Sequence, residues 1–213
     1  MPDNIDAMNA MELDVLREIG NIGSSSAATA LSKIVDKRIT LSLPQVRILK
    51  FDEITKIVGG EEALVVGIMQ PMHGDMAGNI MFLLRLEEAH DLAQIVIHRM
   101  LNVSNKRTLP LEQFDDMEIS ALREVGNIMI SSYLSAISSM TGLRIVTEVP
   151  ELALDMAGAI LSVLTIEFGK IGDSVLYIDS EFSQDNIRVG GDFFLVPDVA
   201  SYSTLLRALG VGQ

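Results

Sequence analysis

Apolar positions recur every three to four residues over two long stretches of the chain, and this spacing predicts two long helices. The stretches cover residues 9–36 and 110–140. On a helical wheel of about 100° per residue, their apolar side chains and three glycines share one arc, which we expect to face a core. The arc holds Leu16, Ile19, Gly20, Gly23, Ala27, Ala30, Leu31 and Ile34 in the first helix, and Ile119, Leu122, Val125, Gly126, Met129, Tyr133, Ala136, Ile137 and Met140 in the second. Glycine inside a helix costs about 1 kcal/mol relative to alanine, so these glycines predict a close approach between the two helices.

Shorter segments after each long helix predict strands, and each half then ends in a further helix. The expected strands are residues 38–49, 63–70 and 79–85, then 143–149, 174–180 and 192–196; the closing helices are 87–101 and 199–209. The pairs Gly59-Gly60, His73-Gly74 and Gly190-Gly191 predict turns. The connections are too short for the crossovers that parallel strands require. We therefore expect an α/β fold in which a mostly antiparallel sheet packs with two long helices.

The two halves of the sequence repeat one another. The segment Leu-Arg-Glu-(Ile/Val)-Gly-Asn-Ile occurs at residues 16–22 and again at 122–128, and a proline follows each copy at the same distance, Pro44 and Pro150. This repetition indicates an internal duplication. We expect one domain over residues 1–213, built as a pseudo-two-fold unit from repeats at about 9–104 and 110–209, with a polar join at 102–108.

A row of polar residues lies opposite the apolar arc of each long helix. The rows are Asp14, Glu18, Asn21 and Ser25, then Ser120, Glu124, Asn127 and Ser131. Any surface helix shows polar residues, but asparagine is poorly suited to a helix interior, and it stands at the same place in both halves. A carboxamide is neither a strong base nor a nucleophile, whereas it can hold a water molecule in line with an electrophile. A glutamate one turn away can accept a salt bridge from a partner. An exposed helix face is no pocket for a small substrate, so the rows suit insertion into the active site of another protein.

Composition removes several other classes of function. A formal net charge of −13 argues against binding to nucleic acid or to an anionic membrane. The chain has no cysteine, which excludes disulfides, thiolate metal sites and cysteine nucleophiles. The acidic, polar start does not resemble a signal peptide and no apolar run approaches the roughly 18 residues that span a bilayer, so we expect a cytoplasmic protein. The three histidines, His73, His90 and His98, lack further ligands nearby, so we expect them to be solvated or hydrogen-bonded rather than to bind a metal.

The spacing [Asp/Ser]-x3-Glu-x2-Asn-x22-Pro is similar to the motif of the CheC-type chemotaxis phosphatases, which include CheC, CheX and FliY. It occurs twice, as Asp14, Glu18, Asn21 and Pro44, then as Ser120, Glu124, Asn127 and Pro150. Two copies without a further domain resemble the CheC group most. The resemblance implies a hydrolase that removes the aspartyl-phosphate of the response regulator CheY. It implies that Glu18 and Glu124 contact the regulator and that Asn21 and Asn127 orient the attacking water. It also implies a monomer with no cofactor of its own, Mg²⁺ being supplied in the active site of the regulator.

The alternative is a non-enzymatic adaptor that binds the receptor deamidase CheD or components of the flagellar switch through the same fold. The segment that begins at Asp155 and ends at Phe168 bears on this question, because its apolar residues cover an arc of roughly 220° on a helical wheel. Its length favours a helix, although its β-branched residues leave a buried strand possible. Either this segment is buried on several sides, or its surplus apolar face docks a partner, for which the resemblance suggests CheD.

Overall fold

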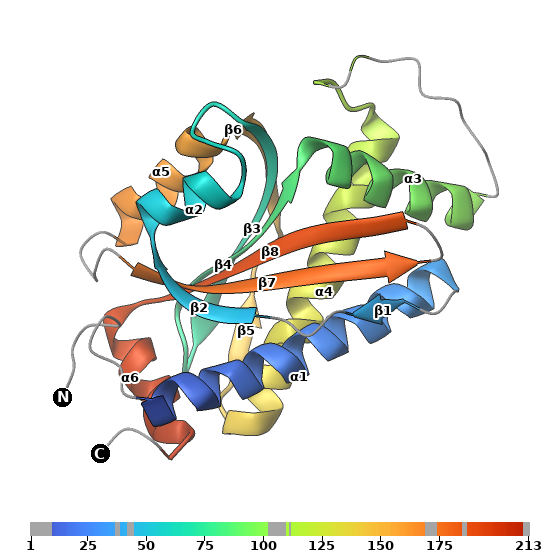
Figure 1. The fold of residues 1–213 in the computed structure, drawn as a ribbon. Helices are drawn as coiled ribbons and strands as arrows, with labels where there is room; N and C mark the ends of the chain where they lie inside the picture. The colour runs from blue at the N-terminus through green and yellow to red at the C-terminus, as the bar shows by residue number, and fades with distance from the viewer. Residues whose placement is uncertain are drawn as a thin grey trace.

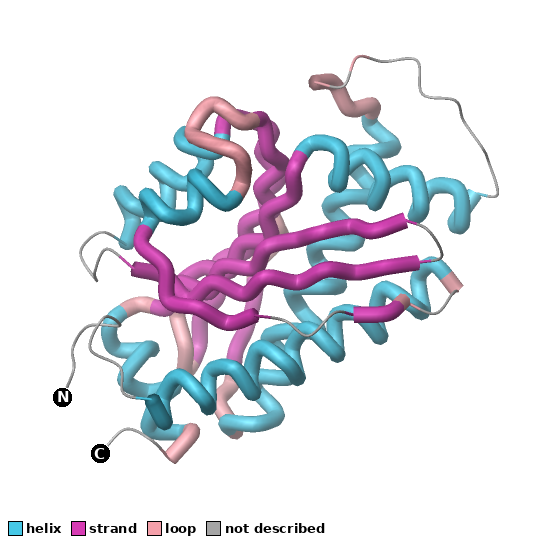
Figure 2. Tube along the Cα trace, viewed as in Figure 1, coloured by secondary structure: helices cyan, strands magenta, loops and turns pink. Residues whose placement is uncertain are grey.

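An antiparallel sheet with helices on both faces forms the centre of the molecule (Figure 1 and Figure 2). The computed structural model describes residues 10–36, 39–41, 45–101, 110, 112–168, 174–184 and 187–210. Within these residues the strand order is β1-β7-β8-β4-β3-β5, while β2 pairs with β7 and β6 pairs with β3. The strands are β1 (Thr40–Leu41), β2 (Gln45–Lys50), β3 (Leu64–Gly74), β4 (Gly78–Arg85), β5 (Ile145–Thr147), β6 (Glu151–Met156), β7 (Ser174–Gln184) and β8 (Ile187–Pro197). Their pairings are antiparallel, as the short connections predicted.

Both long helices predicted from the apolar spacing are present. The helices are α1 (Ala10–Val35), α2 (Phe51–Ile57), α3 (Leu86–Leu101), α4 (Asp116–Thr141), α5 (Ala157–Phe168) and α6 (Val199–Ala208). The expected start of the second long helix at Pro110 is wrong. Asp115 caps α4 by accepting hydrogen bonds from the backbone N–H groups of Met117 and Glu118, and Glu118 accepts from the Asp115 N–H in return. This reciprocal cap satisfies donors that the first helical turn would otherwise leave without partners, and so fixes the start of the helix at Asp116.

The elements of the first half recur in the same order in the second half. Helix α4, strand β6 and helix α5 each begin 106 residues after α1, β2 and α2. The halves meet where β4 pairs with β8, and there Phe82 lies opposite Phe193 with ring centroids 4.6 Å apart. Since these two residues hold corresponding places in their halves, the stack marks the pseudo-two-fold axis of the sheet.

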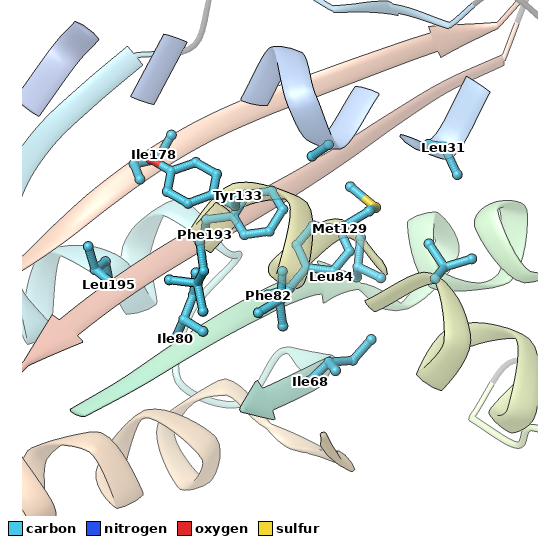
Figure 3. Packing of buried hydrophobic residues seen from close by; sticks show 14 of the residues in the cluster. Leu31, Ile68, Ile80, Phe82, Leu84, Met129, Tyr133, Ile178, Phe193 and Leu195 are labelled. Atoms are coloured by element: carbon cyan, nitrogen blue, oxygen red, sulfur yellow. The ribbon is translucent and has the colours of Figure 1, made fainter. Parts of the chain in front are cut away.

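Alternation along the strands gives the sheet two apolar faces, each covered by its own helices. Helices α1, α3, α4 and α6 cover the face that carries Ile68, Phe82 and Phe193, whereas α2 and α5 cover the other face. Figure 3 shows Tyr133 of α4 among the packed side chains of the first face, beside Phe193. This three-layer arrangement places both polar rows on the same side of the sheet, because α1 and α4 pack against each other there.

One mid-helix glycine packs closely against the other long helix, as the sequence suggested, whereas another packs against the sheet. A side chain at Gly23 of α1 would collide with the ring of Tyr133 on α4, as expected for two helices in close contact. Gly126 of α4 instead faces Ile68 of β3. The close approach at Gly126 is therefore between helix and sheet, and the prediction of helix–helix packing is wrong at that position.

Two further sequence predictions differ from the structure. Gly190 and Gly191 lie inside β8 and not in a turn, because Gly191 leaves the room that the ring of Phe82 occupies on β4. The segment expected to be helical from Asp155 begins as strand β6 and becomes helical only at Ala157. Pro44 and the polar join at 102–108 lie outside the described residues.

Candidate functional site

Each long helix carries its polar row on the surface, with the asparagine at the boundary between surface and core. Glu18 and Glu124 are exposed, whereas Asn21 and Asn127 are each partly buried. Of the remaining row members, Asp14, Ser25 and Ser120 are exposed and Ser131 is partly buried. The rows therefore lie on the surface as predicted, but both amides sit deeper than the carboxylates one turn before them.

Of the two acids in the first row, Asp14 forms an ion pair within the described residues and Glu18 does not. Nη1 of Arg17 donates to Oδ1 of Asp14 over 2.7 Å, and both side chains are more than half exposed. An exposed pair of this kind contributes little to stability. Among the described residues, neither Glu18 nor Glu124 forms an ion pair. Both glutamates can thus accept a basic residue from a partner protein.

The carboxamide of Asn127 is held by a buried residue of the sheet. Nε2 of Gln70, on β3, donates to Oδ1 of Asn127 over 3.1 Å and to the backbone carbonyl of Glu148 over 2.7 Å. Gln70 is only 1% exposed. Sequence analysis missed this residue, and the one signal it offered was a glutamine inside the otherwise apolar run of β3.

The proline of the second motif copy belongs to the loop that Gln70 contacts. Pro150 precedes the first residue of β6, and Glu148 lies two positions earlier in the same loop. The Glu148 N–H donates to the Pro71 carbonyl over 3.0 Å, so two hydrogen bonds attach this loop to β3. Proline suits the entry to an edge strand because it has no N–H to contribute to the ladder. The distant proline of the motif is thereby linked through Gln70 to the asparagine on the helix.

An open groove of about 950 Å³ runs between the later turns of α1 and α4. Serine and threonine residues of both helices line much of it, and some of their hydroxyls bond to their own helix: Thr29 donates to the Ser25 carbonyl and Ser139 to the Ser135 carbonyl, each over 2.8 Å. A groove this open lacks the enclosed walls typical of a small-molecule pocket. The surface beside the two asparagines is thus suited to a macromolecular partner.

The histidines described by the structure make local contacts, as the sequence predicted for His73 and His90. Nδ1 of His90 lies 3.3 Å from Oε1 of the buried Glu118, which also accepts from Gln94, and the His90 ring stacks on Phe114. His73 is exposed, 3.9 Å from a carboxylate oxygen of Glu148. Within the described part of the chain, no three His, Asp or Glu side chains gather in a way that could hold a metal ion. No helix in that part is both long and apolar enough to cross a membrane.

A buried acid lies on the other face of the sheet, away from the polar rows. The hydroxyl of Tyr177 donates to Oδ1 of Asp192 over 2.8 Å. Burial raises the pKa of Asp192 to about 6, and although the hydrogen bond from Tyr177 opposes this rise, the nearby Asp179 adds to it. Burial and the same carboxylate raise the pKa of the Tyr177 hydroxyl above its usual range. Tyr177 belongs to the apolar cluster beneath α2 and α5, across the sheet from both motif helices.

Helix α5 is buried on one side and exposed on the other. Ile160 and Leu161 belong to the core beneath it, whereas Val163 is 41% exposed. A groove of about 250 Å³ lies between α5 and β6, lined largely by apolar residues such as Met69 and Leu152. The side chains of α5 beyond Val163 lie outside the description. The segment is therefore buried on one side, and docking of a partner on its exposed side stays a prediction.

Comparisons with known proteins agree with the duplicated motif. Residues 11–48 and 117–153, which each contain one motif copy, match the sequence model of the CheC-like family. The chain is 32% identical over 203 residues to the CheY-P phosphatase CheC of Bacillus subtilis (strain 168), covering 93% of this chain and 94% of that protein.

Solved structures show the same fold. The structure of Thermotoga maritima FliY matches with a TM-score of 0.72 at 20% identity, covering 97% of this chain and all of that one. The FliG–FliM complex from H. pylori matches with a TM-score of 0.67 at 12% identity, over 94% of this chain. At these identities the likeness concerns the fold alone, whereas the sequence match over nearly the whole chain goes further: the chain belongs to the CheC-like family.

Proposed function

We propose that the protein is a chemotaxis phosphatase that hydrolyses the aspartyl-phosphate of a CheY-type response regulator. The observation that carries the proposal is the pairing, on both α1 and α4, of an exposed carboxylate with a partly buried carboxamide one turn later. The Bacillus subtilis relative, a CheY-P phosphatase by name, supports the same reaction class. Both copies of the pairing lie on one side of the sheet, where a regulator could dock against either helix.

In this proposal Asn21 and Asn127 orient the water that attacks phosphorus. Phosphoryl transfer needs an in-line nucleophile and neutralised phosphoryl charge, and little covalent chemistry from the protein. An amide can hold the water through a hydrogen bond, but it takes no proton, so the proton leaves with the phosphate product. The bond between phosphorus and the aspartyl oxygen breaks, which regenerates the carboxylate of the regulator. Mg²⁺ would be held by the regulator's own acidic residues.

Glu18 and Glu124 are assigned the docking role. Each is exposed, and neither has an ion-pair partner among the described residues, so a basic side chain of the regulator can reach it. A charge-assisted hydrogen bond at this point fixes the angle at which the helix meets the partner. Because the carboxylate and the amide lie on successive turns, docking at the glutamate would bring the asparagine to the phosphoryl group.

Phosphate release from phosphorylated CheY tests the assignment. We expect Asn21→Ala and Asn127→Ala each to leave partial activity, since the other site remains intact. The double variant should lose at least roughly a hundredfold in kcat, the scale of effect expected when a group that positions the nucleophile is removed. Both amides are partly exposed, so the double variant should keep the wild-type circular dichroism spectrum.

The exposed Ser162 of α5 provides a matched control, because Ser162→Ala removes a polar group across the sheet from both motif helices. This control should release phosphate at the wild-type rate. A folded double variant that also did so would refute the water-orienting role, and binding of the regulator without hydrolysis by the wild type would favour the adaptor alternative.

We also propose that the exposed side of α5 docks a receptor deamidase of the CheD type. The supporting observation is the exposed apolar side chain of Val163, which lines the groove between α5 and β6. This surface lies across the sheet from α1 and α4, which would allow deamidase and response regulator to bind at separate places.

A further inference from the structure

Gln70 is a polar residue in a place where an apolar one would be expected. It is 1% exposed, and it lies on β3 between strand positions that pack in the core, Ile68 and Met72. Its Oε1 atom is buried and accepts no hydrogen bond within the described part of the chain. An unpaired buried carbonyl is unfavourable. The two hydrogen bonds that its Nε2 donates, to Asn127 and to the Glu148 carbonyl, are what an apolar side chain could not supply.

These two hydrogen bonds determine which way the Asn127 amide faces. The Glu148 carbonyl can only accept, so the NH₂ group of Gln70, and not its oxygen, must face that carbonyl. The same NH₂ group then requires an acceptor on Asn127, which places Oδ1 against Gln70. The Nδ2 group is the other branch of the same planar amide, and it is directed away from Gln70. A free asparagine would sample both orientations, whereas Asn127 is held in one.

The corresponding position near the first motif has a different residue. Two strand pairings show which residues of the halves correspond. Glu151, the first residue of β6, pairs with Met69, and Gln45, the first residue of β2, pairs with Asp179. Asp179 therefore corresponds to Met69, and the next residue, Ser180, corresponds to Gln70. A serine has a single donor hydrogen, so it cannot donate to two acceptors at once as the NH₂ group of Gln70 does. The two motif copies are alike, but the sheet beneath them is not.

We propose that Gln70 is a positioning residue that orients Asn127 for catalysis and has no such role toward Asn21. This inference rests on the proposed function, and it divides the duplicated molecule into two unequal sites. At the α4 site the amide is pre-organised with its Nδ2 donors presented to the water or to the phosphoryl oxygen. Gln70 achieves this through Glu148 and the loop before Pro150, so the proline of the motif and the asparagine belong to one hydrogen-bonded unit.

Single-site backgrounds of the same protein test the proposal. Gln70→Met keeps the length of the side chain and removes both donors. The constants kcat and KM for phosphate release are to be determined in two backgrounds. In the Asn21→Ala background only the α4 site works, and in the Asn127→Ala background only the α1 site works. We expect Gln70→Met to lower kcat roughly tenfold in the first background, with KM changed less than about twofold, and to leave both constants unchanged in the second.

Gln94→Met is the matched control, because Gln94 also donates through Nε2 to a buried acceptor, Oε1 of Glu118, and makes no such bond to either asparagine. Gln94→Met should change kcat by the same factor in the two backgrounds. Equal loss of kcat from Gln70→Met in both backgrounds would mean a general structural role and would overturn the proposal, as would no loss in either. If Asn21→Ala and Asn127→Ala together left phosphate release intact, the proposed function itself would fail, which is a different result from either of these.

A measurement without substrate checks the orientation directly. In ¹⁵N-resolved NMR spectra, the side-chain amide resonances of Asn127 should shift in Gln70→Met, while those of Asn21 remain in place. Unchanged Asn127 resonances would show that Gln70 does not hold the amide in solution and would overturn the proposal.

Discussion

Asp192 shows at the residue scale how surroundings set the chemistry of a side chain. It is 7% exposed, and burial raises its pKa to about 6, whereas Asp14 lies on the surface in an ion pair with Arg17. Because the folded-state pKa of Asp192 lies above its ordinary value of 3.8, the folded state binds the proton more tightly than the unfolded chain does. The stability that this residue contributes is thus fully present below about pH 4 and is lost as the pH rises through about 6.

Asp192→Asn should therefore stabilise the protein at alkaline pH. The amide removes a buried charge, and its oxygen can still accept the hydrogen bond from Tyr177. We expect the free energy of unfolding at pH 8 to rise by on the order of 2 kcal/mol relative to wild type, with the difference disappearing near pH 4. Urea unfolding across this range provides the measurement. A difference that did not depend on pH would show that the carboxyl group is not the cause.

Residue identity at the site was only partly readable from the sequence. The motif repeat identified Glu18, Asn21, Glu124 and Asn127 as candidates, because two copies at one spacing stand out along the chain. Gln70 could not be found in this way. It is 57 residues from Asn127 in the sequence, its counterpart in the other half is a serine, and only the packing of β3 beneath α4 brings the two amides together.

At the scale of elements, local sequence patterns predicted the two long helices. They did not always predict where an element begins. The apolar spacing of α1 and α4 is a property of the segments themselves, since a helix must bury its apolar face. The start of α4 depends on the capping by Asp115, which a row of acidic residues at 112, 115 and 116 does not locate by itself. Gly191 of β8 faces Phe82, a residue of another strand, and Gly190 faces Glu88 of α3, so neither contact can be read from the local sequence.

The α5 surface gives a prediction at this scale. Val163→Asp places a charge on an exposed apolar position, and we expect it to weaken binding of a CheD-type deamidase by roughly tenfold or more. Phosphate release should stay unchanged, because α5 lies across the sheet from both motif helices. Isothermal titration calorimetry measures the affinity.

Met117→Asp is the matched control for this experiment, since Met117 is 44% exposed and lies on α4. It should bind the deamidase as the wild type does. Normal deamidase affinity in a folded Val163→Asp variant would place the interface elsewhere. Ile160 does not serve for this test: it is buried in the core, so a charge there would destabilise the fold.

For the whole molecule, the sheet separates the two proposed docking faces, and we expect its stability not to depend on a metal ion. We expect the isolated protein to show no stoichiometric Mg²⁺ binding tighter than roughly 1 mM, because no cluster of hard oxygen ligands is present among the described residues. EDTA should leave the thermal unfolding midpoint of the isolated protein unchanged. It should still lower phosphate release, because it removes the Mg²⁺ that the regulator holds. A midpoint that rose with added Mg²⁺ in the absence of regulator would contradict this expectation.

The sequence by itself determined the duplication, the two long helices, the antiparallel sheet and the polar rows. Each of these follows from periodicity or repetition along the chain, and a local pattern is enough because burial of an apolar face and helix geometry act within one segment. Tertiary structure alone decided how deep Asn21 and Asn127 lie, which strand approaches Gly126, and that Gln70 links the loop before Pro150 to the amide of Asn127. These features depend on contacts between residues far apart in the chain, and the symmetry of the motif conceals that the sheet beneath its two copies differs.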